Sequence, residues 1–303
     1  MIAIGYIIVA HAHADHLVRL VQRLRSPGAR FFVHVDRGAP PAVMQVVEQQ
    51  LAGRDDVQLL PRHRVGWARF SQVEATLEGI HAILAHPVPL DYGVLLTGQD
   101  YPLRPPEVIE RRLREAAGRS YLEYWAATGR WRARVDRLHW HGTVLGRRVK
   151  VPNRLMPLSI RRPVPGGLEP FAGRTHWCLS RACLEEIAGF VARRPAVLRE
   201  FRWRSHPDES FFHTILMNSP LAGTIVNDDL RYVDWSQNLP SPRTLTTADL
   251  EAMLGSRDLF ARKFDPAVDA QVLDLLDVQL DAERAADRRM PPERGGRPPA
   301  EHT

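Results

Sequence analysis

The N-terminal half of the chain alternates continuously apolar segments with segments of helical periodicity. Residues 2–9, 31–36 and 92–96 are apolar at almost every position, and apolar residues recur at helical spacing between 17 and 24. A strand buried on both faces, as in a parallel sheet covered by helices, has no polar side. The pattern therefore predicts an α/β fold with a mostly parallel sheet. Its ligand crevice is expected at the carboxyl ends of the strands.

The second half has a looser pattern but no clear linker. Strands are expected at 121–125, 175–179 and 230–235, with helices from 181, from about 207 and over 266–280. We predict one domain over residues 1–280, with one half at 1–125 and an elaborated half at 126–280. Residues 281–303 are rich in Pro, Gly and charge, which predicts a disordered tail.

The charge balance favours an anionic partner. The net charge is +6 and the pI is near 9.8. The tail holds five acidic residues and five arginines, so the excess of basic residues lies within residues 1–280. The arginine-rich region 130–162 either binds an anionic polysaccharide or acidic lipid headgroups, or forms a solvated face. No familiar nucleic-acid module occurs, and no nucleic-acid partner is expected.

Other classes are excluded or disfavoured by simple counts. No apolar run approaches the ~18 residues that a membrane-spanning helix needs. No secretory signal pattern occurs at the start, and the two cysteines cannot form a disulfide framework. We therefore expect a cytoplasmic protein, either free or peripheral on the inner face of a membrane.

Histidines and one carboxylate follow the first two predicted strands. His11 and His13 come after the first strand, and His34 and Asp36 end the second. Imidazoles and a carboxylate at adjacent strand ends could hold a metal ion in a hydrolase. The alternative is that they are polar residues lining the crevice or capping the next helix.

Asp208 and Glu209 open a predicted helix. Two acids in a first turn usually interact only with the helix dipole. Here Glu209 is followed by Phe211 and Phe212, which would bury the turn and raise the basicity of the carboxylate by desolvation.

Three late cations, Arg243, Arg262 and Lys263, indicate an anion site. The chain has no glycine-rich phosphate loop, which disfavours a P-loop ATPase or a dinucleotide oxidoreductase. After the strand at 92–96, where many nucleotide-sugar enzymes hold a cation with Asp-x-Asp, this chain has Gln99-Asp100.

Eight ordered blocks between residues 2 and 280 resemble the core-2/I-branching glycosyltransferase family, including its peptide O-xylosyltransferase members. They are IIVAHAHADHLVRLVQRL, FFVHVDRGA, Val65-Gly66-Trp67, YGVLLTGQDYPLR, THWCLSRACLEEI, PDESFFHTILMNSP, LRYVDWS and LFARKFD. The resemblance implies a GT-A-like fold, with a Rossmann-like nucleotide-binding half and an acceptor half. It also implies inverting transfer of xylose or N-acetylglucosamine from a UDP-sugar to a hydroxyl of a glycan or protein, without a metal cofactor.

The resemblance also assigns roles to residues. It makes Glu209 the general base and Arg243 and Lys263 the diphosphate-binding residues. The remaining positions are nucleotide- or donor-binding candidates (His11, His34, Asp36, Trp67 and Asp100) and acceptor-side candidates (Trp177, Asp208 and Trp235). Residues 126–173 match the family poorly, which leaves the acceptor open. Two other functions remain: a metal-dependent hydrolase using His11, His13, His34 and Asp36, and a non-catalytic protein that binds an anion or a sugar nucleotide.

Overall fold

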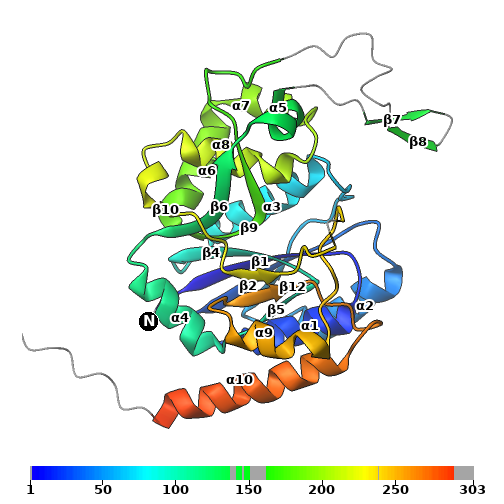
Figure 1. Cartoon of the computed structure of the whole chain (residues 1–303), viewed down its shortest axis with the longest axis vertical. Coiled ribbons are helices and arrows are strands. Elements are labelled where there is room, and N and C mark those ends of the chain that lie inside the picture. The colour runs from blue at the N-terminus through cyan, green and yellow to red at the C-terminus, as the bar shows by residue number, and fades with distance from the viewer. Residues whose placement is uncertain (1, 137–140, 145–146, 151–161, 238, 290–303) are drawn as a thin grey trace, which may run out of the picture.

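A seven-stranded sheet forms the centre of the molecule (Figure 1). The computed structural model describes residues 2–136, 141–144, 147–150, 162–237 and 239–289. The strands lie in the order β10-β6-β9-β4-β1-β2-β3, with bounds β1 Ile4–Ala10, β2 Ala29–Val35, β3 Val57–Leu59, β4 Tyr92–Thr97, β6 Ser120–Ala126, β9 Phe171–Ser180 and β10 Ile225–Val226. Neighbouring strands pair in parallel, except that β9 is antiparallel to both β4 and β6. The predicted α/β class with a mostly parallel sheet is confirmed.

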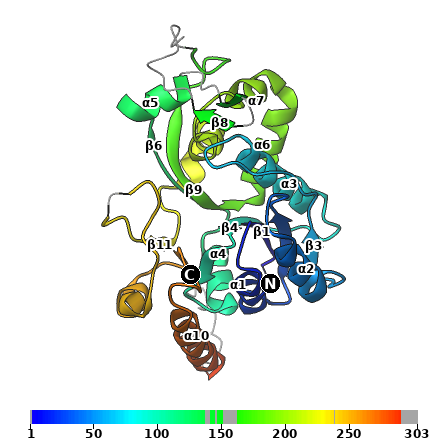
Figure 2. The same cartoon turned by 90° about the vertical axis from the view of Figure 1, so that its right-hand side faces the viewer.

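Helices cover both faces of this sheet, which explains why its strands are continuously apolar (Figures 1 and 2). Adjacent residues Tyr6 and Ile7 of β1 belong to two different core clusters, one on each face. One face is covered by α1 Ala14–Arg23, α2 Pro41–Leu51, α4 Pro106–Glu115, α9 Leu250–Gly255 and α10 Gln271–Arg289. The other is covered by α3 Ser71–Ala85, α6 Arg181–Arg193, α7 Pro195–Phe201 and α8 Phe211–Met217.

A small second sheet carries C-terminal residues to the end of β4. Its order is β11-β12-β5, with bounds β5 Asp100–Pro102, β11 Arg231–Val233 and β12 Phe260–Arg262. Because β5 follows β4 after a two-residue turn, its antiparallel partner β12 is fixed beside the carboxyl end of β4. The remaining elements are α5 Gly129–Asp136, the hairpin β7 His141–Val144 and β8 Arg147–Lys150, and the short 3-10 helices η1 Pro207–Glu209, η2 Ala222–Thr224 and η3 Thr247–Asp249.

Strand β9 joins the two predicted halves of the chain. It comes from the second half and lies between β4 and β6, which belong to the first. Strands β9 and β6 approach each other closely at Gly173. A Cβ at this position would lie 1.9 Å from the carbonyl oxygen of Glu123, so a residue without a side chain is needed there. One sheet therefore spans both halves, and the fold is the GT-A-like α/β arrangement that the resemblance implies.

The prediction that disorder begins at residue 281 is wrong. Helix α10 continues to Arg289, nine residues past Leu280, and lies along the edge of the molecule beneath α1, α4 and α9 (Figure 1). Ion pairs hold its polar side: Arg23 with Asp281, Arg284 with Glu107, and Arg111 with Asp287. Local composition could not indicate these partners, because they lie more than 170 residues away. Residues 290–303 of the predicted tail lie outside the described residues.

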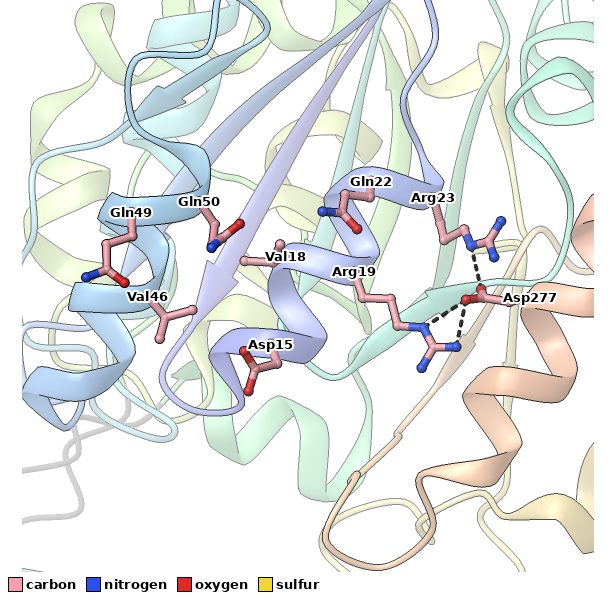
Figure 3. A pocket seen from close by; sticks show the side chains of 9 residues that line it. All are labelled: Asp15, Val18, Arg19, Gln22, Arg23, Val46, Gln49, Gln50 and Asp277. Carbon is pink, nitrogen blue, oxygen red and sulfur yellow. Dashed lines mark hydrogen bonds and ion pairs between the residues drawn. The ribbon is translucent and has the colours of Figure 1, made fainter.

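Asp277 is the central acceptor of this attachment. Its side chain, 13% exposed, accepts hydrogen bonds from Tyr101 Oη at 2.7 Å and from Arg19 Nη2 at 2.6 Å, and pairs with Arg23 Nε at 2.7 Å. Arg19 and Arg23 reach Asp277 across the rim of a surface hollow of about 680 Å³ between α1, α2 and α10 (Figure 3). None of the predicted site residues lines this hollow. Among the described helices, none is long and apolar enough to cross a membrane.

Substituting Asp277→Asn should lower the free energy of unfolding by about 1.5–3 kcal/mol, because two arginines and a tyrosine lose a charged acceptor in a partly buried site. The matched control is Asp274→Asn. Asp274 pairs with Arg19 but is 69% exposed, and its loss should cost less than about 1 kcal/mol. Urea unfolding measures both variants. Equal losses would contradict a central role for Asp277.

Candidate active site

The candidate site lies at the carboxyl ends of β1, β2 and β4. Hydrogen bonds join these ends: the Asp36 amide donates to the Ala10 carbonyl at 2.8 Å, and the Gly98 amide donates to the Val9 carbonyl at 3.0 Å. Because β9 is antiparallel to β4, its residues 174–176 come to the same edge. The fold therefore brings the predicted strand-end residues beside the segment that carries Glu209.

The turn before Glu209 has an unusual backbone. His206 and Ala68 both have left-handed φ values, 51° and 58°, and the His206 amide donates to the Ala68 carbonyl at 3.3 Å. Such conformations are uncommon outside glycine and cluster at functional sites. Trp67, 67% exposed, stands edge-on to the His206 ring at 5.0 Å between centroids. The loop after β3 and the η1 turn are therefore tied together.

Glu209 has the environment of a proton acceptor. Its carboxylate pairs with Arg134 Nη1 at 2.7 Å, and its side chain is 28% exposed, so one side remains open. Burial raises the pKa of Glu209 to about 7, the neighbouring Asp208 adds to this, and Arg134 opposes it. Burial also raises the pKa of Asp208, to about 6, although Thr175 Oγ1 donates to it at 3.1 Å. The predicted desolvation of this turn is present, because Phe211 and Phe212 are fully buried behind it.

Asp100, His176 and Arg262 form a buried group where the two sheets meet. Arg262 Nη1 donates to His176 Nε2 at 2.9 Å, and Arg262 Nε lies 3.4 Å from Asp100 Oδ1. Asp100 is fully buried and accepts from the Thr97 amide at 2.6 Å. Burial raises the pKa of Asp100 and lowers that of His176 well below its usual value. His176 is therefore a neutral acceptor that holds the Arg262 guanidinium.

The two predicted phosphate-binding cations differ in their surroundings. Arg243 lies between Asp234 and Asp249 and donates to both carboxylates. Lys263 Nζ donates to the hydroxyl of Ser241 at 2.8 Å, and within the described ranges it has no carboxylate in an ion pair. Lys263 thus keeps its charge available to an anion, whereas two carboxylates already balance Arg243.

The histidines after β1 and β2 serve separate purposes. His11 is exposed, whereas His34 is fully buried with its ring 4.5 Å from that of His63. Asp36 Oδ1 accepts from the amides of Gly38 and Val65. In the part of the chain that the structure describes, no group of three or more His, Cys, Asp or Glu side chains could hold a metal ion. The ligand set of the hydrolase alternative is therefore not formed.

The acceptor-side prediction for Trp177 is wrong. Successive side chains of a strand point to opposite faces, so Trp177 lies on the opposite face of β9 from His176. It is fully buried against Phe212 and cannot contact an acceptor. Trp235, in contrast, is half-buried under the Arg174 guanidinium, which lies 4.6 Å from the ring centroid.

Sequence reasoning missed Arg134, Arg174 and His176 as site residues, and it noted Arg262 only as one of the late cations. Arg134 and Arg174 contact Glu209 or its surroundings from elements 75 and 35 residues away in sequence. One local signal was present for Arg134: it follows Trp131 by three residues, a helical spacing that places the two side chains together. Arg174 and His176 carried no signal that distinguishes them from surface or core residues.

The raised pKa of Glu209 makes a prediction about stability. The folded state disfavours the ionised carboxylate. The free energy of unfolding therefore falls as pH rises from 4.5, the ordinary pKa of a glutamate, to about 7, the pKa of Glu209 in the folded protein. Glu209→Gln removes this penalty and should raise the free energy of unfolding by about 1–3 kcal/mol at pH 8 but not at pH 4. Thermal unfolding across this range measures it. As a control, Glu123→Gln removes a carboxylate that is 37% exposed and paired with Arg174, and should give no gain. A pH-independent gain in Glu209→Gln would contradict the assignment.

Comparison with known proteins supports the resemblance. The family model described as "Core-2/I-Branching enzyme" matches residues 4–256. Xylosyltransferase 2 of Rattus norvegicus is 28% identical over 307 residues, covering 92% of this chain and 34% of that protein. Xylosyltransferase 2 of Homo sapiens is 28% identical over 305 residues, with the same coverage. The chain thus spans about a third of the length of these curated relatives. Among solved structures, a 4-diphosphocytidyl-2C-methyl-D-erythritol synthase from Anaerococcus prevotii superposes with a TM-score of 0.33 at 9% identity, over 64% of this chain and 76% of that one.

The family match begins at the first strand of the central sheet and extends through helix α9. It includes every strand of the seven-stranded sheet and the turn that carries Glu209. This chain therefore belongs to the core-2/I-branching enzyme family.

Proposed function

We propose that the chain is an inverting glycosyltransferase that moves xylose or N-acetylglucosamine from a UDP-sugar to a hydroxyl of a glycan or protein, forming a β-linkage. The names of the relatives, Xylosyltransferase 2, favour xylose as the first donor to test. The observation that carries the proposal is Glu209, a carboxyl group with a pKa of about 7 in a turn whose outer side is open.

The reaction needs one proton acceptor. The acceptor hydroxyl oxygen attacks C1 of the donor sugar from the face opposite the phosphate, the bond between C1 and the phosphate oxygen breaks, and UDP leaves with the bonding electrons. The hydroxyl proton passes to the Glu209 carboxylate. A base works best when its pKa lies near the operating pH, and burial brings Glu209 into that range.

The leaving diphosphate gains negative charge, and fixed cations can stabilise it. Lys263 is the first candidate, because its ammonium group donates a hydrogen bond to a hydroxyl and is not paired with a carboxylate among the described residues. Arg262, the preceding residue, is held by Asp100 and His176. Arg243 contributes only if the diphosphate shares it with Asp234 and Asp249.

No divalent metal is part of this proposal. The sequence has Gln99-Asp100 where many nucleotide-sugar enzymes carry a metal-binding Asp-x-Asp. Asp100 is fully buried and bonded to the Thr97 amide. Its carboxylate faces Arg262, so a cation there would have to displace an arginine.

The remaining predicted site residues are divided here between a donor side and an acceptor side. Asp36 and exposed Trp67 follow β2 and β3, where the uridine half of the donor is expected. We assign Trp235 and Asp208 to the acceptor side of Glu209. The prediction that the basic region 130–162 meets an anionic glycan or lipid surface falls largely on residues outside those described.

Glu209→Gln should reduce turnover of UDP-xylose or UDP-N-acetylglucosamine by about 10²–10⁴ while leaving donor binding nearly intact, because the amide cannot accept the proton. Release of UDP in the presence of a panel of glycan and peptide acceptors measures turnover. Glu185→Gln, in an exposed ion pair on α6, is the matched control and should keep full activity. Normal turnover in Glu209→Gln would remove this residue from the role of base.

UDP should raise the melting temperature of the protein equally with magnesium and with EDTA, since a ligand of the native state stabilises it by RT ln(1 + [L]/Kd). Lys263→Ala should reduce the UDP-induced shift by weakening affinity about tenfold or more, because a charge-assisted contact with phosphate is lost. Uridine, which lacks the diphosphate, serves as the control and should bind both proteins alike. A UDP shift that disappears in EDTA would refute metal independence, and an unchanged affinity in Lys263→Ala would refute its phosphate role.

A further inference from the structure

Arg134 is held on two sides beside Glu209. Its Nη1 atom lies 2.7 Å from Glu209 Oε2, and its guanidinium carbon lies 4.4 Å from the centroid of the Trp131 ring. Trp131 is in turn packed edge-on against Trp125, at 5.0 Å between centroids. The guanidinium thus lies over the indole ring while one of its nitrogens binds the carboxylate, and the two contacts together restrict the arginine side chain.

The helix that carries Arg134 is itself anchored. Helix α5 ends with Val135 and Asp136, which are both buried, and Arg132 of the same helix donates to the Asp136 carboxylate at 2.6 Å. The Asp136 carbonyl accepts from the Arg162 amide at 2.7 Å. Trp131 and Arg134 are therefore presented from a fixed helix end, so Arg134 can fix Glu209 in turn.

We propose that Arg134 is a positioning residue for Glu209: through its ion pair and its stacking on Trp131, it fixes one orientation and the charged state of the carboxylate. This inference rests on the proposed role of Glu209 as the base. It assigns a function to α5, which lies outside the eight sequence blocks that carry the resemblance.

Among the described residues, the charged groups with the largest influence on Glu209 come from η1, α5 and β9. Asp208 precedes it in η1, and its negative charge favours the protonated form of Glu209. Arg134 and Arg130 from α5 and Arg174 from β9 favour the ionised form. His213 of α8 bonds to the Arg174 carbonyl, and Glu74 of α3 pairs with Arg202, so neither is bound to the Glu209 carboxylate.

Within the described part of the chain, Arg134 is the cation with the shortest contact to this carboxylate, and its influence on the pKa of Glu209 exceeds those of Arg174 and Arg130. Removing its charge should raise the pKa of Glu209 above its value of about 7. The base would then be protonated at neutral pH and would recover only at alkaline pH.

The test follows the Glu209 carboxyl directly. Protein labelled with ¹³C at the glutamate side-chain carboxyl is titrated by NMR from pH 5 to pH 10, and the Glu209 signal is identified by its absence in Glu209→Gln. In Arg134→Gln the midpoint should rise by about one pH unit. Arg134→Lys keeps the charge and should restore a midpoint near that of the wild type. Arg132→Gln removes a charge from the same helix that faces Asp136 and Glu169 instead, and should leave the midpoint unchanged.

Turnover of UDP-xylose supplies the second measurement. The rate of Arg134→Gln relative to the wild type should be about tenfold reduced below pH 6 and about fivefold reduced at pH 7, and should approach the wild-type rate near pH 9. An unmoved midpoint, an equal loss of rate at every pH, or a faster Arg134→Gln enzyme would each overturn the proposal. If Glu209→Gln keeps full turnover, the proposed function of Glu209 fails. If that variant is inactive while the Arg134→Gln midpoint stays in place, only the role of Arg134 fails.

Discussion

The structure depends on keeping two adjacent carboxyl groups, Asp208 and Glu209, out of water. Burying an ionised carboxylate is costly unless it is paired or protonated, and both outcomes occur here. Thr175 and Arg134 supply polar partners, yet the pKa values stay raised, at about 6 and about 7. The fold therefore gives up stability at neutral pH to hold a proton-accepting group ready, as is common at functional sites.

Strand β9 makes this burial possible. It runs antiparallel between β4 and β6 and so brings residues of the second half to the carboxyl ends of the first. Its alternation directs His176 toward Arg262 and Trp177 into the core behind the helix that follows Glu209. The same strand thus supports the charged side of the site and the apolar layer that desolvates it.

Features encoded by neighbouring residues could be predicted, and features encoded by distant partners could not. The apolar strands and the burial of Glu209 by Phe211 and Phe212 follow from local patterns. The balancing of Arg243 by Asp234 and Asp249, and the attachment of α10, depend on ion pairs that composition does not reveal. Trp177 was misplaced because the register of β9, on which its direction depends, is set by its partner strands.

Charge balance links the proposed base to the proposed leaving-group site. Arg134, Arg174, Arg243 and Arg262 each face a carboxylate, whereas Lys263 bonds to a hydroxyl. In the proposed reaction the diphosphate gains one negative charge as its bond to the sugar breaks. The acceptor proton neutralises Glu209 in the same step, which leaves the charge of Arg134 unbalanced by its former partner. The net charge of the Glu209–Arg134 pair thus rises by one as the net charge of the diphosphate falls by one. The total charge within this low-dielectric region therefore stays constant through the transfer.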